Sequence, residues 1–177
     1  KNIKQDTVIF LHTMGSHGPT YFNRYPDKFK KFLPTCDTAD MQKCTKEQIV
    51  NTYDNTILYT DFIVSSAIDI LKKFPQYEAG LIYVSDHGES LGENNMYLHG
   101  FPYALAPKEQ IEVPMLVWMN GTMKKWDYID FSCLKKEAAS QSFSHDNIFH
   151  SLVGLLEIDT KEYGKNLDMF NPCRKKK

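Results

Sequence analysis

The sequence predicts an α/β fold whose mainly parallel sheet is flanked by helices. Three short apolar runs have the composition of strands buried on both faces, and they cover residues 7–13, 80–85 and 113–119. Helical patterns lie between and after these runs. Strands that alternate with helices are typical of parallel sheets, because a crossover helix joins two strands that run in the same direction.

The size and composition of the chain fit one globular domain or part of one. Its 177 residues are 42% hydrophobic and 24% charged, which is an ordinary balance for a packed core with a solvated surface. The formal net charge of -1 gives no field that would recruit nucleic acid, so no nucleic-acid partner is expected. Only Arg174–Lys177 is locally basic. This run is expected to be a solvated chain end, with an electrostatic membrane contact as the alternative.

The first predicted strand indicates that the chain is part of a larger domain. Residues 8–11 are all apolar and follow a short polar lead, Lys1–Asp6. A strand buried on both faces normally lies in the middle of a sheet, so its neighbours are expected from elsewhere in the protein. The lead has no apolar signal-peptide segment, and no window reaches the roughly 18 to 20 apolar residues of a membrane-spanning helix.

A long helix is predicted between the first two strands. Thr45 followed by Gln48 is a capping-box pattern, and Pro75 ends the helical run. The apolar residues between them recur near helical spacing, namely Ile49, Tyr53, Ile57, Ile63, Ala67, Ile70 and Phe74. A second helix is predicted to start at Ser144–Asn147, which is rich in capping residues, and to continue through Ile148–Leu156.

The four cysteines lack the close pairs that are typical of zinc sites. Cys36 and Cys44 flank a polar stretch with the composition of a surface loop, so a disulfide across this loop is favoured. Cys133 and Cys173 lie far apart in the sequence, and whether they pair with each other stays open. Disulfides would place the domain in an oxidising compartment such as a periplasm.

Two polar clusters, His12–Thr20 and Asp86–Glu89, follow directly after predicted strands. Ligands of open α/β sheets bind at such strand ends. Asp86 and His87 could direct an oxygen and a nitrogen at one zinc ion if the backbone turns sharply, and Gly88 allows that turn. The alternative is a turn in which Asp86 caps a helix and His87 is solvated. The preceding strand and the following segment favour the metal site.

The segment Ser85–Gly100 closely resembles the metal-binding motif of the phosphoethanolamine transferases, which modify lipid A and include the mobile colistin-resistance enzymes. Further matches to that family are Gly15–Tyr21, Tyr53–Thr56, Val113–Met115 and Ser144–His150. The resemblance implies the fold of alkaline phosphatases and sulfatases. It also implies that residues 1–177 are the carboxyl-terminal portion of one catalytic domain.

The resemblance implies roles for four residues and supports one disulfide. Asp86 and His87 match zinc ligands of the family. His17 and His99 match histidines that contact the phosphoryl group or bind further zinc, so they are expected to act in catalysis and substrate binding. The spacing of Cys36 and Cys44 matches a family disulfide.

Two further residues are expected to hold the metal ligands in place without binding the metal themselves. Glu89 could hold a ligand histidine in place, with capping of the turn as the alternative. His145, next to Asp146, could orient the site in the same way, although a hydrogen bond at the helix start is the simpler interpretation.

The implied reaction is zinc-dependent transfer of phosphoethanolamine from phosphatidylethanolamine to a phosphate of lipid A or another envelope acceptor, through a threonine intermediate. In the family, the threonine, a glutamate ligand and the membrane domain lie upstream of the segments matched here. The missing amino-terminal part of the same enzyme is therefore an expected partner, and the expected location is the periplasmic side of the inner membrane. The alternatives are a zinc-dependent phosphatase or sulfatase of the same superfamily, or a binding module without catalysis.

Overall fold

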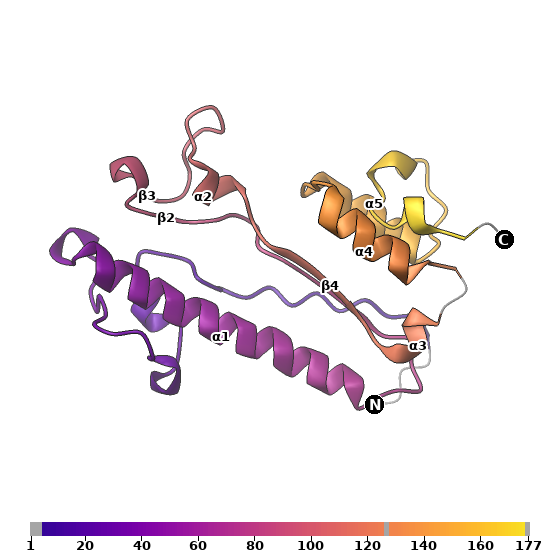
Figure 1. Ribbon diagram of the computed structural model, residues 1–177, viewed down its shortest axis with the longest axis horizontal. Helices are drawn as coiled ribbons and strands as arrows, with labels where there is room; N and C mark the ends of the chain where they lie inside the picture. The colour runs from indigo at the N-terminus through magenta and orange to yellow at the C-terminus, as the bar shows by residue number, and fades with distance from the viewer. Residues whose placement is uncertain (1–4, 126–127, 176–177) are drawn as a thin grey trace. The chain divides into compact units, whose positions relative to one another are not determined.

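The computed structural model describes residues 5–125 and 128–175 (Figure 1). The chain divides into two compact units, of which the first comprises residues 1–67 and 87–114 and the second residues 68–86 and 115–177. Within the described ranges, none of the helices combines the length and the hydrophobicity that crossing a bilayer requires.

The long helix α1, Lys46–Lys72, confirms the prediction from the capping box. The backbone N–H of Gln48 donates to Thr45 Oγ1 at 3.2 Å, and the N–H of Thr45 donates to Gln48 Oε1 at 2.8 Å. These reciprocal bonds satisfy two donors that a helix start would otherwise leave unpaired. The start of α1 is therefore fixed by its own side chains.

The core of the first unit forms where α1 meets the preceding loops. Ile49 is 2% exposed and packs with Tyr21, Cys36 and Met41. The predicted Cys36–Cys44 disulfide is present and closes the loop that covers this face. Three 3-10 turns shape the loops, namely η1 (Tyr21–Asn23), η2 (Asp27–Phe29) and η3 (Met41–Lys43).

A small hairpin completes the first unit. Strand β2, Ser90–Leu91, pairs antiparallel with β3, Tyr97–Leu98, around the 3-10 turn η4, Glu93–Asn95. The short helix α2, Lys108–Ile111, follows. The sequence pattern predicted neither strand, because two-residue strands are too short to display a period.

The second unit contains the only strands that coincide with predicted ones in the described part of the chain. Strand β1, Gly80–Val84, pairs with β4, Met115–Met119, and Ile82 lies opposite Val117. The pairing is antiparallel, so the expectation that these two strands run parallel is wrong. A continuous apolar run is typical of a parallel strand but does not fix the strand's direction. The expected burial on both faces is also wrong for β4, because Leu116 and Val117 are 41% and 38% exposed.

The expected strand at residues 7–13 is not a strand in this structure. The segment is irregular, and Ile9, Phe10 and Leu11 are 70%, 80% and 74% exposed. A strand needs a hydrogen-bonded partner, and none of the described segments pairs with this one. The apolar run therefore has no strand partner within residues 5–125 and 128–175.

Helices of the second unit surround a core of Met119, Met123, Ile129, Phe170 and Cys173. The helices are α3 (Gly121–Lys124), α4 (Phe131–Ser140) and α5 (Asp146–Leu155), and two 3-10 turns follow, η5 (Lys165–Leu167) and η6 (Asn171–Cys173). Helix α5 was predicted. Helix α4 was not, because Phe131 and Leu134 are its only large apolar residues and two positions are too few to show a helical period.

The second disulfide joins Cys133 in α4 to Cys173 in η6, which settles the pairing that the sequence left open. Beside it, Arg174 Nη2 lies 2.9 Å from Asp168 Oδ2, and the Asp168 side chain is fully buried. Arg174 is therefore part of the packed unit, and the expectation of a solvated end is wrong for this residue. Lys176 and Lys177 lie outside the described residues.

Candidate metal centre

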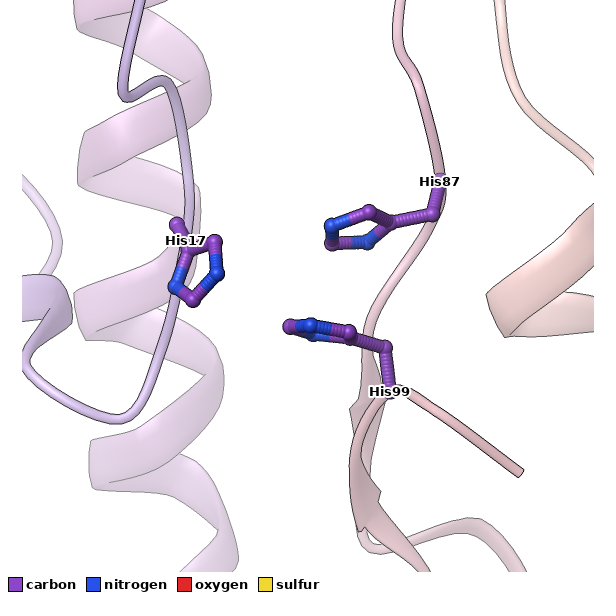
Figure 2. Close-up of side chains that lie close together, drawn as sticks. All are labelled: His17, His87 and His99. Atoms are coloured by element: carbon purple, nitrogen blue, oxygen red, sulfur yellow. The ribbon is translucent and has the colours of Figure 1, made fainter.

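Three histidines of the first unit converge from three separate segments (Figure 2). His17 comes from the loop before η1, His87 precedes β2, and His99 follows β3. One ring nitrogen of each lies within 4.8 Å of one nitrogen of each of the others. The rings of His87 and His99 stack with their centroids 3.8 Å apart, and His17 meets His99 edge-on at 4.9 Å.

Hydrogen bonds at Nδ1 fix the tautomer of all three rings. Each Nδ1 lies next to a backbone carbonyl oxygen or a carboxylate oxygen. Such an oxygen accepts hydrogen bonds and has no proton to donate. The pairs and their nitrogen–oxygen distances are His17 with Gly18 O at 2.7 Å, His87 with Gly88 O at 2.9 Å and His99 with Glu89 Oε1 at 2.9 Å. Each Nδ1 must therefore carry the proton. In the neutral ring, each Nε2 then offers a lone pair to a metal ion.

The hairpin register explains why Glu89 meets His99. Ser90 pairs with Leu98, so the residues one step beyond this pair, Glu89 and His99, lie opposite each other at the open end of the hairpin. Cross-strand neighbours in an antiparallel pair have side chains close enough to bond. The nine residues between Glu89 and His99 in the sequence are thus folded back by the turn at η4.

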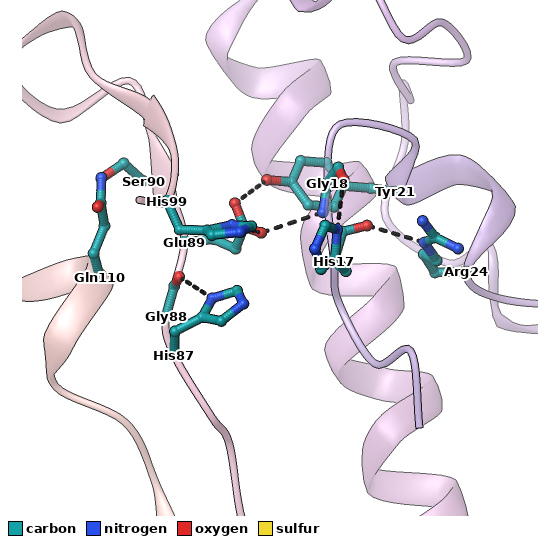
Figure 3. Close-up of polar contacts among 10 residues, drawn as sticks. All are labelled: His17, Gly18, Tyr21, Arg24, His87, Gly88, Glu89, Ser90, His99 and Gln110. Atoms are coloured by element: carbon teal, nitrogen blue, oxygen red, sulfur yellow. Dashed lines mark hydrogen bonds and ion pairs between the residues drawn. The ribbon is translucent and has the colours of Figure 1, made fainter. Parts of the chain in front are cut away.

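Glu89 links the loop of His17 to the ring of His99 (Figure 3). Its Oε1 accepts from the backbone N–H of Gly18 at 3.2 Å and from His99 Nδ1, and its Oε2 accepts from the Tyr21 hydroxyl at 2.9 Å. The Glu89 side chain is only 3% exposed. Burial raises the pKa of the Tyr21 hydroxyl, and the charge of Glu89 adds to that effect, so Tyr21 stays protonated and donates.

The backbone around His87 is held against α2. The N–H of Gly88 donates to Gln110 O at 2.9 Å, and Gln110 Nε2 donates to the buried Ser90 hydroxyl at 2.8 Å. A Cβ atom at Gly88 would overlap the carbonyl oxygen of Glu109. Glycine is therefore required at position 88 for a close approach of two backbones, and not only for a turn as the sequence indicated.

Replacing Gly88 by alanine is expected to lower the free energy of unfolding by about 2 kcal/mol, since the α2 backbone has to move away. Urea titration followed by circular dichroism measures this loss. Gly121→Ala is the matched control, because a Cβ there meets nothing within 4 Å. Equal stability of the Gly88→Ala and Gly121→Ala proteins would contradict the predicted backbone contact.

Asp86 and His145 fall outside the cluster of three histidines. Asp86 belongs to the second unit and is exposed. In that same unit, His145 Nε2 lies 2.8 Å from Ser85 O, where an Nε2–H donates to the carbonyl at the end of β1. The zinc-ligand role of Asp86 and the supporting role of His145 stay predictions.

Sequence reasoning missed Tyr21 and Gln110. Tyr21 bonds to a residue 68 positions away, and Gln110 bonds to one 20 positions away. No local spacing indicates such contacts, because each depends on how separate loops pack. The Glu89–His99 pair could have been predicted only from a hairpin pattern around residues 90–98. That pattern is too short to recognise in the sequence, because each strand has two residues.

The donor set of the cluster fits a zinc ion. Zinc binds imidazole nitrogen at about 2.0–2.1 Å in tetrahedral geometry, which places two ligand nitrogens about 3.3 Å apart. Nitrogens that already lie within 4.8 Å of one another reach that spacing by small side-chain rotations. Three neutral imidazoles, each fixed through Nδ1, leave one tetrahedral position for another ligand or a substrate oxygen.

Comparison with known proteins gives consistent matches. The model of the Sulfatase family matches residues 1–158. The chain is 54% identical over 175 residues to phosphoethanolamine transferase EptA of Escherichia coli K12, covering 98% of the chain and 32% of that protein. It therefore spans about a third of the length of the curated relatives it matches.

Solved structures match the same region. The soluble domain of lipooligosaccharide phosphoethanolamine transferase A from Neisseria meningitidis matches with a TM-score of 0.90 at 47% identity, over 94% of this chain and 50% of that one. The C-terminal periplasmic domain of phosphoethanolamine transferase EptC from Campylobacter jejuni matches with a TM-score of 0.82 at 48% identity, over 91% and 50% of the two chains. The predicted sulfatase-like fold is thus confirmed, and this chain covers about half of each of these two solved chains.

Proposed function

The chain belongs to the Sulfatase family, and from that membership we propose that it is the carboxyl-terminal portion of the catalytic domain of a phosphoethanolamine transferase. The observation that carries the proposal is the cluster of His17, His87 and His99, all with Nε2 available. Similarity to named phosphoethanolamine transferases over nearly the whole chain supports this reaction above others in the family.

The metal is proposed to be zinc, with Asp86 and His87 among its ligands. When bound, zinc supplies positive charge that lowers the pKa of a coordinated hydroxyl and stabilises charge on the phosphoryl oxygens. His17 and His99 lie beside His87, and each offers a ring nitrogen to the same cluster, so they either contact the phosphoryl group or hold a further ion. In its protonated form, each of these two rings can donate a hydrogen bond from Nε2 to a phosphoryl oxygen or a proton to the leaving group.

The proposed reaction has two steps. A threonine oxygen attacks the phosphorus of phosphatidylethanolamine, the bond from phosphorus to the glycerol oxygen breaks, and diacylglycerol leaves with a proton. A phosphate oxygen of lipid A or another envelope acceptor then attacks the same phosphorus and releases the threonine. The chain spans about a third of its relatives' length, and the threonine is proposed to lie in the amino-terminal part of the protein, outside residues 1–177.

The periplasmic side of the inner membrane is the proposed location. The structural match from Campylobacter jejuni is itself a periplasmic domain, and the two disulfides of this chain are suited to an oxidising compartment. Lipid A and phosphatidylethanolamine would both be reached there.

Residues 1–177 by themselves are expected to bind zinc weakly and to transfer no phosphoethanolamine, because the nucleophile and part of the ligand set are proposed to lie outside them. The longer protein is expected to move a labelled headgroup from phosphatidylethanolamine to lipid A. Mass spectrometry of the lipid A product measures this transfer for both forms.

A simple phosphate monoester serves as the control substrate. A transferase turns it over slowly relative to the lipid donor, whereas a phosphatase of the same family does the reverse. Substantial transfer by residues 1–177 alone would contradict the placement of the threonine outside the chain, and preference of the longer protein for the monoester would contradict the transferase itself.

A further inference from the structure

The loop Lys28–Pro34 presents apolar side chains outward in a sequence rich in lysine. Its residues are Lys-Phe-Lys-Lys-Phe-Leu-Pro. Phe32 and Leu33 are 44% and 63% exposed, and Lys28 and Lys31 are exposed beside them. Single exposed apolar residues are common on protein surfaces, but two adjacent ones between lysines form a distinct amphipathic surface.

Buried polar side chains of α1 hold the backbone of this loop. Asn55, which is 0% exposed, accepts from the N–H groups of Lys31 and Phe32 at 2.7 and 2.9 Å and donates to Phe32 O at 3.0 Å. One helix turn earlier, Asn51 Nδ2 donates to Pro34 O at 3.1 Å. With its backbone anchored at both ends of the Phe32–Leu33 pair, the loop holds these side chains away from the core instead of folding them into it.

The apolar surface continues onto the same face of α1. Asn55, Tyr59 and Phe62 follow at spacings of four and three, so they lie along one face of the helix. The Phe29 ring lies 4.8 Å from Tyr59 and 5.0 Å from Phe62, centroid to centroid. Lys28 Nζ lies 5.0 Å from the centroid of Phe29 and 4.9 Å from that of Phe62, so its ammonium caps this aromatic group.

The charges on this surface favour a lipid headgroup layer over a protein partner. Lysine is depleted in the core of protein interfaces, whereas aromatic rings with lysines at their edge are typical of membrane-interface surfaces. Lys30 is paired with Asp37 at 2.8 Å, so Lys28 and Lys31, which are both exposed, are the lysines of this loop that can meet a headgroup. Their positive charge is complementary to anionic headgroups.

We propose that the Lys28–Pro34 loop binds the surface of an anionic lipid bilayer, with Phe32 and Leu33 inserted among the headgroups and Lys28 and Lys31 on lipid phosphates. The inserted side chains contribute the apolar part of the free energy of binding, and the lysines contribute the electrostatic part. The loop backbone needs no rearrangement, because Asn51 and Asn55 already hold it. This inference does not depend on the proposed transfer reaction.

Sedimentation of residues 1–177 with vesicles tests the inference. The chain is expected to bind vesicles that contain phosphatidylglycerol and to bind pure phosphatidylcholine vesicles weakly. The double variant Phe32→Ser/Leu33→Ser is expected to bind at least about tenfold more weakly to the anionic vesicles. Lys28→Gln/Lys31→Gln is expected to lose about tenfold or more on the same vesicles, and that loss should shrink in high salt. Phe149→Ser is the matched control, since Phe149 is 52% exposed and lies in the other unit.

A fluorescent label in the loop tests insertion into the bilayer without relying on the loss-of-binding variants. The four native cysteines are all in disulfides, so Leu33→Cys adds a single free thiol for an environment-sensitive fluorophore. Vesicle binding is expected to shift its emission to the blue, and the same label at Gln42→Cys is expected not to shift. Failure of the wild-type chain to bind anionic vesicles, equal losses in the Phe149→Ser control, or binding without an emission shift at position 33 would overturn the proposal.

Discussion

Replacing His87 by alanine in the full-length protein is expected to lower the rate of phosphoethanolamine transfer by at least about a thousandfold. The variant removes one of three imidazole rings, each of which has a ring nitrogen within 4.8 Å of a ring nitrogen of the other two. A metal ion contributes several kcal/mol of charge stabilisation in the transition state, and each 1.4 kcal/mol corresponds to about a tenfold change in rate. Zinc content of the purified protein, measured by atomic emission, is expected to fall together with the rate.

The control for this loss is a histidine outside the cluster. His150 Nδ1 accepts a hydrogen bond from the N–H of Gly164 at 2.9 Å, and the side-chain oxygen of asparagine can accept the same bond. His150→Asn is therefore expected to retain zinc and activity. A His87→Ala protein with full zinc content and an unchanged rate would contradict the proposed centre, whereas a rate loss with full zinc content would place His87 on the substrate instead of the metal.

The elements that the sequence predicts well are those with a strong local pattern. Helix α1 has a capping box at Thr45 and Gln48 and a long apolar period, and the structure confirms both bonds of the box. Strands β1 and β4 were located correctly from their apolar composition but assigned the wrong relative direction, because direction depends on the order of strands in a sheet. Residues 7–13 have the composition of a strand without a described partner to pair with.

The candidate site also contains residues that a local sequence pattern predicts and contacts that no local pattern predicts. The residues Asp86 and His87 follow a strand and precede a glycine, which is a local pattern, and the family resemblance added His17 and His99. The sequence suggested that Glu89 supports a histidine, but the identity of that histidine follows from the hairpin register. The contact from Tyr21 to Glu89 could not be predicted, because it joins two loops 68 residues apart.

Replacing Glu89 by alanine is expected to lower the free energy of unfolding of residues 1–177 by about 3 to 5 kcal/mol. The variant removes the acceptor for the Gly18 N–H, the Tyr21 hydroxyl and His99 Nδ1–H at once. Gly18 and Tyr21 are both buried, so water cannot replace the lost acceptor without opening the loop. Urea unfolding followed by circular dichroism measures the loss, and a midpoint equal to that of the wild-type chain would contradict it.

Glu89→Gln separates the structural role of this residue from its effect on the metal. The glutamine oxygen can still accept from Gly18 and His99, and its amide can donate to a Tyr21 hydroxyl that has rotated to accept, so most of the stability should return. The negative charge behind His99 is lost, and changes of this kind behind a metal-binding histidine lower metal affinity by about 10-fold to 100-fold. The expected result is therefore a stable Glu89→Gln chain, and weaker zinc binding by calorimetry in the longer protein with the same substitution. Undiminished zinc affinity in that longer protein would mean that Glu89 only holds the loops together and has no effect on metal binding through His99.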